Sequence, residues 1–241
     1  MPLPGSPGWR GDLKQVMDKA LQDLEALEEG GAHGAIVENF GDRPFPKKAT
    51  LATLVAMAVV VERVAQRARI PIGVNVLRSD GEAAMAIASL CGAAFIRVNV
   101  FCGVALTDQG LMEGEAHRIL SLRRSLGAEV AVLADVHVKH AFHFGTIAAA
   151  ARDAARNKAD ALIITGGGTG EEASPEDLES AKEASGLPVL VGSGITPENV
   201  SRFARADGFI VGTYLKEGGE TEAPVDPRRV AEMAEAIASL P

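Results

Sequence analysis

The sequence has few cysteines, no excess of basic residues and no long apolar run. Its 241 residues include only two cysteines, Cys91 and Cys102, and neither lies in a Cys-x-x-Cys metal or redox motif. A reduced, cytoplasmic setting is therefore expected. The formal net charge of −8 argues against a nucleic-acid surface, because phosphate backbones attract basic patches.

The longest apolar stretch is also too short to enter a membrane. It covers residues 50–61 and is bracketed by charged side chains at positions 47, 48, 62 and 63. A bilayer span needs roughly 20 apolar residues, so we interpret this stretch as a buried helix. The first seven residues are rich in proline and do not resemble a signal peptide, so membrane insertion is not expected.

The sequence does contain a regular alternation of two patterns. Its length and its 47% hydrophobic content suit one large α/β domain over residues 1–241. Segments with helical spacing separate short apolar runs that are rich in β-branched residues. The runs cover residues 35–37, 72–76, 95–99, 130–134, 161–164, 189–191 and 208–211. Strand-helix alternation of this kind predicts a parallel sheet.

A parallel (β/α)8 barrel, the TIM barrel, is the predicted architecture. Seven strands are evident, and an eighth has to come first, where only residues 1–4 are available, so the first strand is expected to be short or incomplete. The rival is an open doubly wound sheet, which usually has a glycine-rich turn after its first strand. Here the glycine turns lie near the C-terminus, which favours the barrel. Three helix starts are marked by a capping residue before proline, at residues 174–175, 196–197 and 226–227.

Two of these glycine turns follow the last two predicted strands and form the clearest functional signal. Glycine lets backbone N–H groups approach an anion closely, and the loops after strands seven and eight of such barrels often bind phosphate. The predicted phosphate ligands are Gly192, Ser193, Gly194, Gly212 and Thr213.

Arg97 and Asn99 are the polar residues of the run at 95–99, and their shared parity predicts that both point into the barrel. An arginine inside a hydrophobic strand is costly unless it is paired or binds an anion. A structural ion pair with Glu38, at another strand end, is the alternative of about equal weight.

Asp135 and His137 come directly after the run at 130–134, and Lys139 follows them. Asp135 and His137 are two residues apart, so in an extended strand their side chains would point to the same side. An Asp-x-His pair at a strand end suits either an acid-base histidine or a divalent metal. A solvated loop with a structural aspartate is the simpler interpretation, with His140 and His143 on that loop. Lys139 would neutralise a phosphate or carboxylate, or be solvated.

Further polar residues complete the ring of strand ends. Asn39, Asn75 and Glu38 offer amides and a carboxylate, which suit a polyhydroxylated ligand because it needs donors and acceptors. Thr165 and Gly166 begin a glycine-rich segment that lacks the Lys-Ser or Lys-Thr ending of a P-loop. We interpret this segment as a loop beside the same mouth, either a lid or a plain linker.

Six ordered motifs across nearly the whole chain resemble the BtpA/SgcQ family. They are PLPGSP at 2–7, VENFGD at 37–42, GVNVLR at 73–78, FIRVN at 95–99, ADVHVKH at 134–140 and GSG at 192–194. The resemblance implies a TIM-barrel-like protein, linked in cyanobacterial members to the stable accumulation of photosystem I, and it implies no established reaction. Family members usually carry Asn-Asp where this chain has Ser79 and Asp80.

The leading hypothesis is an enzyme, a lyase, isomerase or hydrolase, that acts on a small phosphorylated metabolite and requires no cofactor. Asp135 or His137 would be the general base, and Arg97 would stabilise a developing oxyanion. A non-enzymatic assembly factor is the second hypothesis. The third is a metal-dependent hydrolase or lyase that uses Asp135, His137 and Glu38. A homodimer or higher homo-oligomer is expected in each case.

Overall fold

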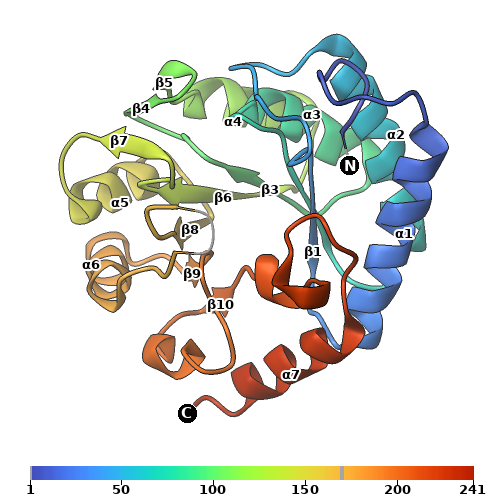
Figure 1. The fold of residues 1–241 in the computed structure, drawn as a ribbon. Helices are drawn as coiled ribbons and strands as arrows, with labels where there is room; N and C mark the ends of the chain where they lie inside the picture. Colours follow the sequence, from blue (N-terminus) through green and yellow to red (C-terminus); the bar gives the residue numbers. More distant parts are fainter. Residues whose placement is uncertain (1, 169–170) are drawn as a thin grey trace.

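Seven parallel strands form the centre of the computed structural model, which describes residues 2–168 and 171–241 (Figure 1). The sheet order is β1 (Ala35–Glu38), β2 (Ile72–Asn75), β3 (Phe95–Val98), β6 (Ala131–Val136), β8 (Ala161–Ile164), β9 (Val189–Val191) and β10 (Gly208–Phe209). Each strand pairs in parallel with its neighbour in that order. The barrel prediction is confirmed, because the sheet curls and helices alternate with its strands.

Helices surround the strands as an outer ring (Figure 1). They are α1 (Leu13–Glu29), α2 (Leu51–Arg67), α3 (Gly81–Cys91), α4 (Ala116–Ser125), α5 (Ile147–Arg156), α6 (Pro175–Ser185) and α7 (Pro227–Ala238). The last helix packs against the first, which closes the ring. Asp23 on α1 strengthens this closure, since it accepts bonds from Lys216 Nζ at 3.1 Å and from the backbone N–H of Val225 at 3.0 Å.

The predicted first strand is not formed within the described residues. Residue 1 lies outside them, and residues 2–4 adopt no strand. Instead, the N–H of Leu3 donates to Asp42 Oδ1 at 2.7 Å, and Thr53 Oγ1 donates to the carbonyl of Pro4 at 2.9 Å. The N-terminal segment is therefore bound to the loop after β1 and to the start of α2, because its prolines withhold the N–H groups that a ladder requires.

A small antiparallel sheet, which the sequence analysis did not anticipate, is built from the loops after β3 and β6. Its order is β5 (Gly110–Glu113), β4 (Val104–Thr107) and β7 (Ala141–His143). His143 therefore lies in a strand and not in the expected loop. Gly110, at a φ of +89°, makes the tight turn between β4 and β5 that few other residues would tolerate.

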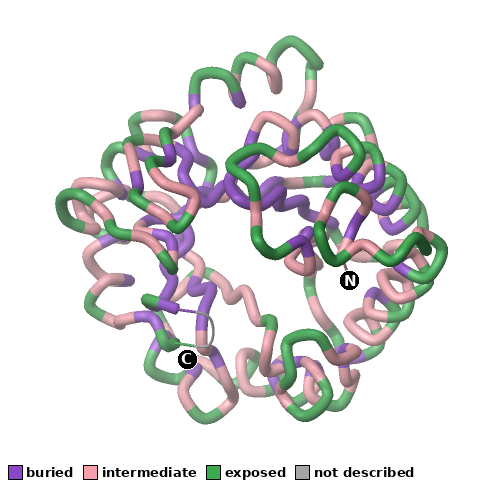
Figure 2. Tube along the Cα trace, turned by 45° about the horizontal axis from the view of Figure 1, so that its top comes forward, coloured by how far each residue is buried: buried purple, intermediate pink, exposed green. Residues whose placement is uncertain are grey.

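The main core lies between the strands and the helix ring (Figure 2). Helix α2 contributes one face to it, with Met57 and Val61 buried, but Leu51 and Val55 are 78% and 57% exposed. The helix expected from this apolar stretch is therefore formed, and it is buried along one face. Within the barrel, a Cβ on Gly73 would stand 2.1 Å from the ring of Phe95, so the absence of a side chain makes room for that aromatic ring.

Two of the three predicted helix starts begin α-helices. Ser174 and Asp226 accept N-cap hydrogen bonds at the starts of α6 and α7, and each precedes a proline. Thr196 instead precedes a short 3-10 helix, Val200–Phe203. Shorter 3-10 turns follow at Thr213–Leu215 and Glu217–Gly219. Over residues 2–168 and 171–241, none of the helices is long and apolar enough to cross a bilayer.

Candidate functional site

A buried polar cluster occupies the carboxyl ends of β1, β2, β3 and β6, where ligands bind in this fold. Arg97 and Asp135 meet across the adjacent strands β3 and β6, with Nε to Oδ1 at 2.9 Å and Nη2 to Oδ2 at 3.0 Å. Asn99 Nδ2 also donates to Asp135 Oδ2, at 2.9 Å. Burial lowers the pKa of Arg97, but the Asp135 carboxylate beside it outweighs this effect and raises that pKa above its ordinary value.

The carboxylate that pairs with Arg97 is thus not the one weighed in the sequence analysis. Glu38 accepts a hydrogen bond from Asn75 Nδ2 at 2.6 Å, and the two residues are register partners on β1 and β2. Glu38 lies two strands away from β3, whereas Asp135 is on the strand that pairs with β3. The Arg97–Glu38 ion pair is therefore corrected to an Arg97–Asp135 pair, and the Glu38 carboxylate is held at the mouth by a single amide.

Two amide oxygens in this cluster lack hydrogen-bond donors. Asn75 and Asn99 are 1% and 4% exposed, and their Oδ1 atoms have no partner among the described residues. A buried acceptor without a donor is unfavourable by about 1–3 kcal/mol, so such atoms usually have a ligand or water to bind. The cluster therefore offers two acceptors to a molecule that brings hydrogen-bond donors into the barrel.

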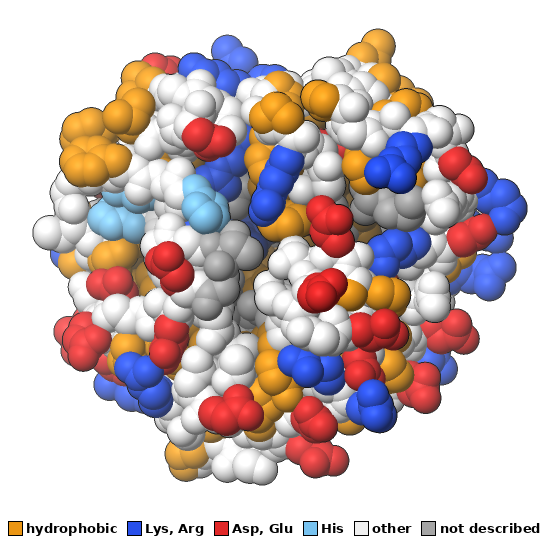
Figure 3. All heavy atoms as spheres, viewed as in Figure 1, with side chains coloured by type: hydrophobic (Ala, Val, Ile, Leu, Met, Phe, Trp, Pro, Cys, Tyr) orange, Lys and Arg blue, Asp and Glu red, His pale blue; other side chains and the backbone are white. Residues whose placement is uncertain are grey.

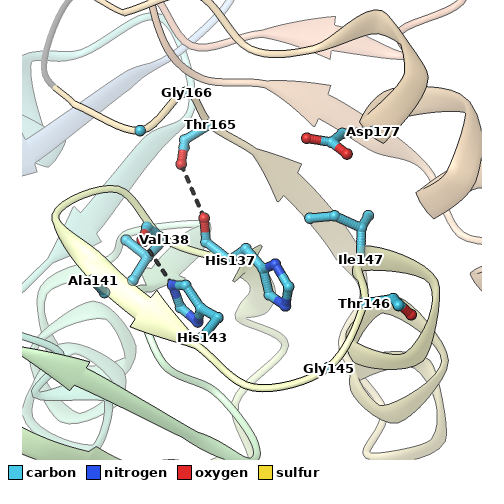
Figure 4. Close-up of a pocket in the computed structure, with 11 residues that line it drawn as sticks. His137, Val138, Ala141, His143, Gly145, Thr146, Ile147, Thr165, Gly166 and Asp177 are labelled. Carbon is cyan, nitrogen blue, oxygen red and sulfur yellow. Dashed lines mark hydrogen bonds between the residues drawn. The ribbon is translucent and has the colours of Figure 1, made fainter.

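His137 lies in a separate pocket of about 450 Å³, outside this cluster (Figure 4). Its φ of +53° breaks the strand alternation after Asp135, so the expected common face is not formed. Its ring stacks on that of His143 at 4.6 Å between centroids, and His143 Nε2 donates to the carbonyl of Val138 at 2.8 Å. Thr146 and Asp177, at the starts of α5 and α6, line the same pocket.

His137 should make the protein less stable in mild acid. Burial, together with the adjacent His143, lowers the pKa of His137 below its usual value, so the unfolded chain binds this proton more readily than the folded one. Its contribution to stability is present above pH 6.5 and is lost as the pH falls through the folded-state pKa. The free energy of unfolding of His137→Phe should therefore decline less than that of wild type between pH 7.5 and pH 5.5.

Urea unfolding at the two pH values measures this difference, with His117→Gln as the control because His117 is exposed on α4. The control should follow the wild-type decline. If the free energy of unfolding of His137→Phe declines as much as that of the wild type, the lowered pKa of His137 in the folded protein is contradicted.

Lys139 and Thr165 are joined at the edge between the cluster and the histidine pocket. The N–H of Lys139 donates to Thr165 Oγ1 at 3.1 Å, and Thr165 Oγ1 donates to the carbonyl of His137 at 3.5 Å. Burial, followed by the nearby positive charge of Arg97, lowers the pKa of Lys139. The ammonium group is thus held in partly desolvated surroundings.

Arg78 belongs with these residues, although the sequence analysis did not single it out. It is 6% exposed, follows a cis peptide bond after β2, and its Nη2 donates to the carbonyl of Lys139 at 2.7 Å. Its position three residues beyond Asn75 on the same strand end was the available signal. Asn39 has partners inside the protein, because Oδ1 accepts from the N–H of Leu77 at 2.7 Å and Nδ2 donates to Asp42 Oδ2 at 3.1 Å.

The two glycine turns follow β9 and β10, which are neighbours and the last two strands of the barrel. The N–H of Gly192 is used within the sheet, where it donates to the carbonyl of Ile164 at 2.8 Å. Ser193 Oγ donates to the carbonyl of Gly168 at 3.2 Å. Gly212 is open, since among the described residues no heavy atom beyond its two chain neighbours lies within 4 Å of where its Cβ would stand, and Thr213 begins a 3-10 turn.

The loop after β8 packs onto the first of these turns. A Cβ on Gly194 would stand 2.7 Å from the backbone of Glu171 and Glu172, and a Cβ on Gly166 would stand 2.3 Å from the carbonyl oxygen of Glu171. Residues 169 and 170 of the segment interpreted as a lid or linker lie outside the described residues. Both glycines therefore allow close backbone packing beside the mouth.

The residues suggested for a metal site are not gathered together. Within residues 2–168 and 171–241, no three His, Cys, Asp or Glu side chains are grouped so that they could hold a metal ion. Asp135 is occupied by Arg97 and Asn99, and His137 faces the other pocket.

Comparison with known proteins assigns the family. A sequence model of the BtpA family matches residues 1–239. The chain belongs to the BtpA family. The BtpA-family chain is 48% identical over 242 residues to an uncharacterised protein of Pyrococcus abyssi, covering 100% of this chain and 93% of that protein. It is 46% identical over 244 residues to the photosystem I biogenesis protein BtpA of Synechocystis, covering 99% of this chain and 85% of that protein.

Solved structures extend the likeness of this BtpA-family barrel to enzymes of the same fold. The N-(5'-phosphoribosyl)anthranilate isomerase of Pyrococcus furiosus superimposes with a TM-score of 0.61 over 91% of this chain and 94% of that one, at 16% identity. Identity at this level shows the shared fold alone.

Proposed function

We propose that this protein is an enzyme that binds a small phosphorylated metabolite, such as a sugar phosphate, at the carboxyl-terminal mouth of its barrel. The observation that carries the proposal is a pair of buried amide oxygens, Asn75 Oδ1 and Asn99 Oδ1, that have no hydrogen-bond partner among the residues that the structure describes. They lie at the same mouth as the two glycine turns. Sugar hydroxyls supply the donors that these oxygens lack.

The phosphate would be bound by backbone N–H groups of the turns after β9 and β10. Ser193, Gly194, Gly212 and Thr213 are the candidates, while the N–H of Gly192 is already used by the sheet. Support comes from the open surface over Gly212 and from the frequent phosphate site after the last two strands of such barrels. The named substrate of the similar isomerase also carries a phosphoribosyl group.

Each polar side chain of the cluster has a role that its contacts support. Asp135 holds Arg97 rigidly, because both carboxylate oxygens accept bonds from Arg97 or Asn99. Arg97 would then stabilise a developing oxyanion on the substrate. Glu38, bound through one oxygen by Asn75, is the carboxylate best placed to accept a proton, which favours an isomerase, lyase or hydrolase reaction.

Thermal unfolding in the presence of matched ligands tests this proposal. Ribose 5-phosphate at about 100 times its Kd would stabilise the protein by about 2.7 kcal/mol and raise the Tm by several degrees. Ribose without the phosphate should have little effect. An equal response to both compounds, or to neither in the millimolar range, would contradict phosphate recognition.

An exposed apolar strip on the outer surface of α2 supports the homo-oligomer expected from the sequence. Leu51, Val55 and Val59 recur at four-residue spacing and are 78%, 57% and 44% exposed, and Leu90 on the neighbouring α3 is 75% exposed. This apolar strip lies outside the mouth and would fit a second copy of the chain. Sedimentation velocity should then show a dimer that Val55→Glu converts to a monomer.

A further inference from the structure

Two cationic side chains at the mouth, Arg78 and Lys139, have no carboxylate partner in the part of the chain that the structure describes. Arg78 is 6% exposed, and its Nη2 donates to a neutral group, the carbonyl of Lys139, at 2.7 Å. Among the residues that the structure describes, no Asp or Glu oxygen lies within ion-pair distance of either side chain, whereas Arg97 nearby has Asp135 at 2.9 Å. A buried, unpaired guanidinium is costly and favours the arrival of an anion.

The charges around this pair do not neutralise it. Within the buried cluster, Asp135 is already paired with Arg97, and Glu38 accepts a hydrogen bond from Asn75, so the cations Arg78, Lys139 and Arg97 outnumber these two carboxylates by one. The exposed Asp108, in the turn between β4 and β5, attracts Arg78 less than Asp135 does but more than Glu38 does, and it makes no ion pair with Arg78 among the described residues. Burial lowers the pKa of both Arg78 and Lys139, as expected for positive groups that lack full compensation.

The position of the pair differs from that of the glycine turns. Arg78 follows β2 and Lys139 follows β6, which lie on either side of β3, whereas the turns follow β9 and β10 at the far end of the sheet order. Because the sheet is curled, these two groups of strand ends face each other across the mouth. Figure 3, in the same view as Figure 1, shows the centre of this surface hollowed, with Lys and Arg side chains at its border.

We propose that Arg78 and Lys139 form a second anion site, so that the substrate is a small polyhydroxylated molecule with an anionic group at each end. This rests on the proposed function, in which the first anion is the phosphate on the glycine turns. The second is a phosphate or carboxylate that accepts hydrogen bonds from the Arg78 guanidinium and the Lys139 ammonium. Hydroxyl groups between the two ends donate to Asn75 Oδ1 and Asn99 Oδ1.

Calorimetric titration with matched pairs of probes, at constant ionic strength, tests this inference. Fructose 6-phosphate is compared with fructose 1,6-bisphosphate, and glucose 6-phosphate with 6-phosphogluconate, which distinguishes a phosphate from a carboxylate at the second site. The wild-type protein should bind one of the doubly anionic probes about 10-fold or more tighter than its partner, which is the usual scale of a charge-assisted contact.

The preference should disappear in the variants of the pair. Arg78→Met and Lys139→Gln should each bring the affinity for the doubly anionic probe close to the affinity that the wild-type protein shows for the matching monophosphate. Arg152→Met, on the exposed surface of α5, serves as the control and should behave as wild type. The melting temperature of Arg78→Met without ligand should not fall, because the variant removes an uncompensated buried charge.

The outcomes separate this inference from the proposed function. If monophosphates bind but a second anion adds no affinity, the second site is overturned and the proposed function stands. A preference that persists in both Arg78→Met and Lys139→Gln overturns the assignment to these residues. If no phosphorylated probe binds the wild-type protein, both proposals are overturned.

Discussion

Asp135→Ala should destabilise the protein by about 3–5 kcal/mol, the usual penalty for leaving one partner of a buried ion pair without the other. The Asp135 side chain is fully buried and Arg97 is 7% exposed, so water cannot replace the lost carboxylate. Asn99 would lose its acceptor at the same time. Urea unfolding of the variant measures the loss.

Two comparisons make that prediction specific. The double variant Arg97→Met/Asp135→Leu should recover much of the stability, because apolar side chains of similar volume remove the uncompensated charge. Asp153→Ala, which breaks the exposed Arg156–Asp153 pair, should have a far smaller effect. A loss for Asp135→Ala as small as that of Asp153→Ala would contradict the buried pair.

Gly194→Ala should be the second strongly destabilising change, by about 2–4 kcal/mol. Gly194 has a φ of +64°, which an alanine adopts at a cost of about 1 kcal/mol. The added Cβ would also stand 2.7 Å from the backbone of Glu171 and Glu172, which requires the loop to move at a further cost of about 1–3 kcal/mol.

Gly186→Ala is the matched control, because Gly186 has a φ of +65° and no described residue beyond its two chain neighbours lies within 4 Å of its Cβ position. This variant should show only the conformational cost. The difference between the two free energies of unfolding isolates the packing of the loop on the turn. Equal losses would show that Glu171 and Glu172 do not pack against Gly194.

The strand order and the helix ring could be predicted from the sequence because apolar periodicity and proline-marked caps are local signals. Parity also placed Arg97 inside the barrel. Parity does not say which carboxylate an inward arginine reaches, because that depends on strand adjacency, and only β6, not β1, lies next to β3. The Asp135 partner therefore emerged only from the three-dimensional structure.

Other features left no readable sequence signal. The positive φ of His137, +53°, turns its side chain away from the barrel. Non-glycine residues rarely adopt a positive φ, so the sequence does not predict this conformation. Strands β4, β5 and β7 are only three or four residues long and lie inside loops. The N–H of Gly192 donates a hydrogen bond to the carbonyl of Ile164 on the neighbouring strand, and a glycine motif alone does not predict such a tertiary contact.

Crystals of the protein soaked in millimolar ribose 5-phosphate test the central claim most directly. We expect the phosphate within hydrogen-bond distance of backbone N–H groups among Ser193, Gly194, Gly212 and Thr213. The sugar hydroxyls should reach Asn75 Oδ1 and Asn99 Oδ1. A mouth that stays free of ligand at saturating concentration, or a phosphate bound away from both turns, would contradict the claim.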